Sequence, residues 1–187
     1  MLVLSLLACV PHLYTDGQGE PLSWLAPENG WYAGQPPDGF EAAGFQTGDV
    51  VPELVGFDQN GDEVSTWQFY GRVTVLDIST MWCGPCQDLA TGVEHTQETY
   101  ADEVVYATIL PENIENKPPS QEDLAYWADS FGIETAPVIA DHDFWYEPAV
   151  PDGTFPKILV TYDDMTVCES DVAPNDGAVI AAIEACL

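Results

Sequence analysis

Two cysteines separated by two residues are the part of this sequence with the most definite chemistry. Cys83 and Cys86 flank a Gly-Pro pair and follow a mostly apolar run of strand length over residues 73–79. Where a buried strand meets a helix, the first cysteine lies beside unpaired backbone N–H groups that favour its thiolate. We therefore expect Cys83 to attack a disulfide and Cys86, one helical turn later, to resolve the mixed disulfide.

The same spacing also fits a zinc half-site or an inert disulfide. Zinc takes four ligands, and the remaining candidates, Cys168 and Cys186, supply no second short spacing. We favour redox chemistry over both alternatives. On this interpretation the protein needs no metal and no cofactor other than the disulfide between Cys83 and Cys86.

The elements that would position the cysteines follow from the hydrophobic pattern. An Asn60-Gly61 turn between residues 54–57 and 63–65 indicates a β-hairpin. Ser120 followed by Asp123 indicates the start of an amphipathic helix. Further strands are expected at 73–79, 103–110, 157–162 and 165–169, and further helices at 83–100 and 176–187. This order predicts an α/β protein with one mixed sheet covered by helices.

The motif Trp82-Cys83-Gly84-Pro85-Cys86 after an apolar strand resembles the active site of the thioredoxins. Two further positions match that family, and they are Asp77, six residues before Cys83, and Pro156 before the strand expected at 157–162. The stretch 48–86 is more similar to the exported, membrane-tethered thioredoxin-like reductases and to the peroxiredoxin-related superfamily. The resemblance covers about residues 45–187 and implies a thioredoxin fold with an N-terminal hairpin extension.

The resemblance also implies roles for the matching residues. A buried Asp77 would have a raised pKa and would take the proton from Cys86 during resolution. A cis bond before Pro156 would let the adjacent backbone pair with an extended substrate segment. Trp82 would shield one side of the disulfide and offer an apolar landing surface.

The implied function is thiol–disulfide exchange in exported proteins, and we favour the reducing direction. The partners would be protein thiols or disulfides and an upstream electron donor or acceptor. Cys168 and Cys186 could meet in this fold, because the last strand and the last helix are adjacent. A structural disulfide, two buried thiols and a second redox pair all remain open for these two cysteines.

Two other functions share part of this pattern. Thr80 lies three residues before Cys83, as in thiol peroxidases, but Leu76 replaces the proline of that pattern and no arginine is an evident candidate. A copper carrier could combine the two cysteines with His142, although such carriers space their cysteines by three residues. Both functions are kept as alternatives.

The N-terminus resembles the end of a bacterial lipoprotein signal, because an apolar run over residues 1–8 ends in Ala8 and Cys9. A plain signal peptide and a buried N-terminal segment are the alternatives. We divide the chain into a signal-like segment (1–9), a Gly- and Pro-rich tether (10–44) and a thioredoxin-like domain (45–187). The expected location is the bacterial periplasm or cell surface, with a lipid on Cys9.

The charge is extreme, with 3 basic residues against 32 acidic ones and a net charge of −29. Such a surface repels phosphate backbones and anionic headgroups, which argues against nucleic acid binding and electrostatic membrane binding. A lipid anchor would therefore be the means of membrane attachment. Salt bridges within the protein are expected to be scarce.

Overall fold

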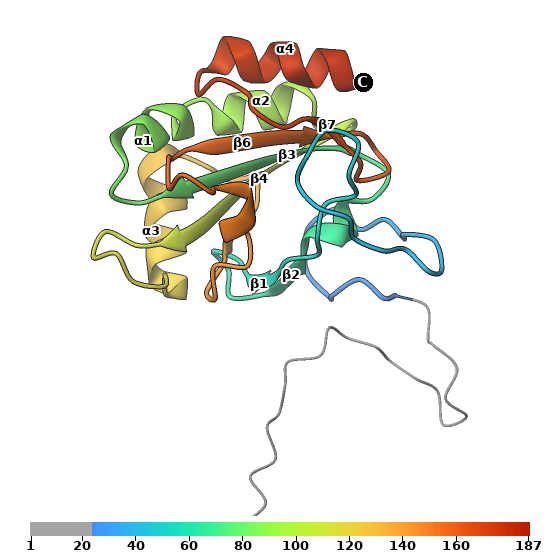
Figure 1. The fold of residues 1–187 in the computed structure, drawn as a ribbon. Helices are drawn as coiled ribbons and strands as arrows, with labels where there is room; N and C mark the ends of the chain where they lie inside the picture. Colours follow the sequence, from blue (N-terminus) through green and yellow to red (C-terminus); the bar gives the residue numbers. More distant parts are fainter. Residues whose placement is uncertain (1–23) are drawn as a thin grey trace, which may run out of the picture.

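The computed structural model describes residues 24–187 and centres on a five-stranded mixed sheet of order β5-β4-β3-β6-β7 (Figure 1). The central strand, β3, is buried along its whole length, as its apolar sequence predicts. It pairs in parallel with β4 and antiparallel with β6. The sheet comprises β3 (Val73–Thr80), β4 (Val104–Glu112), β5 (Val138–Ala140), β6 (Lys157–Thr161) and β7 (Val167–Glu169).

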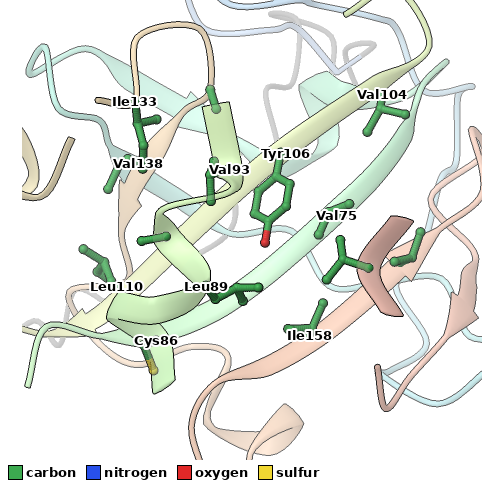
Figure 2. Packing of buried hydrophobic residues seen from close by; sticks show 14 of the residues in the cluster. Val75, Cys86, Leu89, Val93, Val104, Tyr106, Leu110, Ile133, Val138 and Ile158 are labelled. Atoms are coloured by element: carbon green, nitrogen blue, oxygen red, sulfur yellow. The ribbon is translucent and has the colours of Figure 1, made fainter. Parts of the chain in front are cut away.

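Four α-helices contribute to one apolar cluster on the sheet. Figure 1 shows α1, α2 and α4 side by side over the sheet, and α3 packs at the β5 edge. Tyr106 and Leu89 lie in this cluster, and Figure 2 shows Cys86 among the same buried residues. The helices are α1 (Gly84–Ala90), α2 (Val93–Thr99), α3 (Gln121–Phe131) and α4 (Asp176–Cys186). The predicted α/β thioredoxin fold, a mixed sheet flanked by helices, is confirmed.

The single helix predicted over 83–100 is wrong, since it divides into α1 and α2 at Thr91 and Gly92. The Thr91 hydroxyl donates to the carbonyl oxygen of Asp88, 2.7 Å away. A Cβ atom on Gly92 would lie 2.5 Å from a carboxylate oxygen of Asp176 at the start of α4. The break therefore occurs where another element approaches the backbone, which hydrophobic periodicity does not reveal.

A second apolar cluster covers the other face of the sheet. It includes Val64 of the hairpin formed by β1 (Val55–Phe57) and β2 (Glu63–Ser65), which pairs antiparallel as predicted. Between β2 and β3 runs a 3-10 helix, η1 (Thr66–Phe69), and a second one, η2 (Glu147–Ala149), follows β5. The strand β5 itself is three residues long and was not predicted.

Part of the segment assigned to the tether lies against the domain. The ring of Phe40 contacts those of Trp67 and Tyr70 edge to face, at centroid distances of 4.9 and 5.6 Å. The indole N–H of Trp31 donates to the buried carboxylate of Asp58. Residues 24–44 thus add aromatic contacts to the hairpin side of the molecule.

A disulfide joins Cys168 on β7 to Cys186 on α4, with Cα atoms 6.1 Å apart. Both residues are buried, so this bond fastens the C-terminal helix to the edge of the sheet. The predicted signal segment and Cys9 lie outside the described residues. Within residues 24–187, every helix is too short or too polar to cross a bilayer.

Candidate active site

The Cys83–Cys86 pair forms a disulfide at the start of α1, with Cα atoms 5.2 Å apart. Cys83 is the N-cap of this helix, and the backbone N–H of Cys86 donates to its sulfur at 3.3 Å. Pro85 lies in the first turn, where a missing N–H costs no hydrogen bond. Cys83 keeps a small exposed fraction of 5%, whereas Cys86 is fully buried. Attack on a substrate requires an accessible Cys83, and resolution within the protein allows Cys86 to be buried.

The peptide bond between Phe155 and Pro156 is cis. It precedes β6, which lies next to β3, and so brings Pro156 to the disulfide. The carbonyl oxygen of Phe155 is 3.5 Å from the sulfur of Cys83. An extended peptide that reached this sulfur would therefore meet the backbone of Phe155.

Asp77 is 1% exposed and lies on β3. Alternation along the strand places its side chain on the same face as Val73 and Val75, which belong to the cluster that contains Cys86. The hydroxyl of Ser79 donates to one carboxylate oxygen at 2.6 Å, while the other oxygen has no partner among the described residues. Burial raises the pKa of Asp77 to about 7, and the hydrogen bond from Ser79 partly opposes this rise.

Trp82 is 40% exposed beside the disulfide. Its indole N–H donates to a carboxylate oxygen of Glu112 at 2.8 Å, and its ring meets Phe155 edge to face at 5.9 Å. Phe155 in turn stacks on Phe144, with centroids 6.2 Å apart. Ser79, Glu112 and Phe144 were not predicted from the sequence. Ser79 could have been found, because it lies two residues from Asp77 on the same face of one strand.

His142, the third ligand of the alternative copper site, is exposed and lies 3.6 Å from a carboxylate oxygen of Asp143. In the described part of the chain, no three His, Cys, Asp or Glu side chains are grouped so as to hold a metal ion. Lys157, which follows Pro156, is paired with Asp171 at 2.7 Å.

The chain is similar in sequence to a thioredoxin-like protein. The chain is 25% identical over 98 residues to the thioredoxin-like protein YneN of Bacillus subtilis (strain 168). This match covers 52% of the chain and 55% of that relative, so it spans about half of each. No protein-family model matches the chain.

Solved structures extend the similarity over most of the described residues. The thioredoxin domain of a thiol-disulfide oxidoreductase from Bacteroides vulgatus superposes with a TM-score of 0.61 at 16% identity, covering 77% of this chain and all of the other. A DsbF homologue from Corynebacterium diphtheriae superposes with a TM-score of 0.60 at 20% identity, and the match covers 83% of this chain and 99% of the other. A thiol:disulfide interchange protein from Chlorobium tepidum superposes with a TM-score of 0.59 at 16% identity, and the match covers 77% of this chain and 99% of the other. The chain thus has the thioredoxin fold with a Cys-x-x-Cys disulfide, and it is similar to a thioredoxin-like protein and, in structure, to thiol-disulfide oxidoreductases.

Proposed function

We propose that the protein is a thiol–disulfide oxidoreductase that reduces disulfides in other proteins. The observation that carries this proposal is the position of Cys83, which caps a helix, keeps a small exposure and lies 3.5 Å from the carbonyl oxygen next to the cis bond. Cys86 lies behind it, one helical turn away. A nucleophile, a resolving thiol and a place for an extended substrate are thus combined.

The reaction has two exchange steps. The Cys83 thiolate attacks one sulfur of a substrate disulfide, a mixed disulfide forms, and the other substrate sulfur leaves as a thiolate. Cys86 then loses its proton and attacks the sulfur of Cys83, which releases the second substrate thiol. The substrate gains two electrons, and the protein ends with the Cys83–Cys86 disulfide.

Asp77 is the proposed acceptor of the Cys86 proton. A carboxylate whose pKa lies near 7 is suited to accept and return a proton at neutral pH. Its second oxygen, which has no partner among residues 24–187, leaves it free to do so. The Asp77→Asn variant should therefore slow resolution and accumulate the mixed disulfide, while formation of that disulfide by Cys83 proceeds.

We also propose that the protein is exported and held at a membrane by a lipid on Cys9. The disulfide between Cys168 and Cys186 joins β7 to α4 and is of the kind that persists in oxidising compartments. Mass spectrometry of Cys9 from the full chain, with a Cys9→Ala variant as control, tests this part. An unmodified, uncleaved N-terminus in a competent bacterial host would refute it.

The redox activity is tested by trapping and by equilibrium. Cys86→Ser should accumulate a mixed disulfide with a substrate protein, and Cys83→Ser should not. Equilibration of the wild-type pair in thiol buffers gives its potential, for which roughly −270 mV would indicate a reductant and roughly −120 mV an oxidant. A pair that stayed reduced throughout, or that trapped no substrate, would overturn the proposal.

A further inference from the structure

Three aromatic rings form a row that starts at the reactive sulfur. We call Trp82, Phe155 and Phe144 the aromatic ridge. Trp82 precedes Cys83 in the chain and meets Phe155 at 5.9 Å, and Phe155 meets Phe144 at 6.2 Å. Trp82 is exposed, and the other two rings are half-buried, so each member retains apolar surface that a partner can cover.

The loop between β5 and β6 is built to hold the far end of this ridge. Phe144 has a φ of 52°, in the left-handed region that large side chains disfavour. The Asp141 carboxylate fixes the turn, because it accepts the backbone N–H groups of Trp145 and Tyr146 at 2.6 and 2.8 Å. Tyr146 is fully buried, and its hydroxyl donates to the carbonyl oxygen of Pro52 at 2.8 Å. A half-exposed ring in an unfavourable backbone conformation indicates a role outside core packing.

The charge around the ridge is negative. Glu112 lies at one end, bonded to the indole of Trp82, and Asp143 precedes Phe144 at the other. The protein has three basic residues, and each has a polar partner in the described chain: Lys157, two residues after Phe155, pairs with Asp171, Lys117 pairs with Glu115, and Arg72 donates to the carbonyl oxygen of Ala101. A partner that covers the ridge therefore gains from carrying positive charge.

From these observations we propose that the aromatic ridge is the docking surface for the protein substrate. Its occupant is an extended, positively charged segment that carries a large apolar side chain next to its disulfide cysteine. The backbone of this segment meets the carbonyl of Phe155, the cysteine meets Cys83, and the apolar side chain covers Phe155 and Phe144. This inference rests on the proposed thiol–disulfide exchange and adds the class of substrate.

The test uses the reduced full chain and peptides that contain one internal disulfide. The residue before the first cysteine is Phe or Gly, and the flanking residues are Lys or Glu, which gives four peptides of equal length. KM and kcat are measured at low and high ionic strength. The wild type should bind the Phe–Lys peptide best, with a KM about tenfold below that for the Gly–Lys peptide. High salt should weaken the preference for Lys over Glu.

Phe144→Ala should abolish the distinction between Phe and Gly peptides. Phe144→Asn is the second variant, because Asn tolerates the left-handed conformation and keeps the loop in place without the ring. The matched control is Trp145→Ala, which removes the neighbouring aromatic side chain, 58% exposed and outside the ridge. Trp145→Ala should keep the wild-type preference.

The outcomes separate this inference from the proposed function. If the wild type reduces all four peptides with equal KM, or prefers Glu flanks, the docking proposal fails while the oxidoreductase stands. A preference for Phe that survives in both Phe144 variants also overturns it. If no peptide and no protein disulfide is reduced, the proposed function fails and the docking proposal fails with it.

Discussion

Replacement of Asp77 by Asn should stabilise the protein, and the gain should depend on pH. The structure buries this carboxyl almost completely, with one hydrogen bond from Ser79 and one oxygen that lacks a partner in the described chain. Asn has nearly the same shape and still offers an oxygen to Ser79, but it carries no charge. The substitution therefore isolates the free energy of burying the ionised form.

The size of the stability difference follows from the thermodynamic linkage between proton binding and folding. Folding raises the pKa of Asp77 from 3.8 to about 7. Each pKa unit corresponds to about 1.4 kcal/mol, so the ionised side chain costs the folded state roughly 4 kcal/mol. Below pH 3.8 the carboxyl is neutral in both states, and the cost is absent. Between pH 3.8 and about 7 the unfolded chain releases its proton first, so wild-type stability falls, and above about 7 the full cost applies.

The assay is urea unfolding of the oxidised wild type and Asp77→Asn across this pH range, with linear extrapolation to water. The acidic residues, 32 in all, make both proteins pH-dependent, but that contribution cancels in the difference. The variant should match the wild type in acid and exceed it by roughly 4 kcal/mol above neutrality. A difference that does not change with pH would refute the reasoning, because the pKa of Asp77 would then be the same in the folded and unfolded states.

Three further predictions follow from the same structure. Ser79→Ala removes a donor that lowers the pKa of Asp77, so the midpoint of the pH-dependent stability change should move to higher pH, and Ser79→Thr should restore it. The double variant Cys168→Ala/Cys186→Ala should lose about 3 kcal/mol of unfolding free energy in urea titrations, because the bond closes a loop with a sequence separation of 18. If the double variant had a lower unfolding free energy than the wild type only under reducing conditions, this prediction would be contradicted. Gly56→Ala should destabilise the protein by about 1–3 kcal/mol, because the added Cβ would overlap the backbone carbonyl at the end of β5, whereas Gly84→Ala has open space and serves as the packing control.

Much of the active site could be predicted because its signals are local. Cys83 and Cys86 are close in sequence, and the apolar run before them requires a buried strand. Asp77 lies on that strand, where alternation alone fixes its face. The hairpin needs only the Asn-Gly turn, and α4 needs only its apolar stripe.

Other features arise where distant segments meet, and no local pattern encodes them. The helix break at Gly92 depends on the approach of α4, and the pairing of Cys168 with Cys186 depends on the packing of α4 against the sheet edge. β5 is too short to show a period and exists because β4 supplies its hydrogen bonds.

The sequence by itself determined the reactive pair and the central strand, since each rests on residues within a few positions of one another, and the order of its expected elements determined the class of fold. Only the tertiary structure decided what surrounds that pair. Trp82, Glu112, Phe144 and Phe155 come from four separate parts of the chain, and they meet because β3 and β4 end where β6 begins and the loop between β5 and β6 turns back beside them. Side-chain contacts between such segments depend on strand register and loop conformation, which are set by the packing of the whole domain.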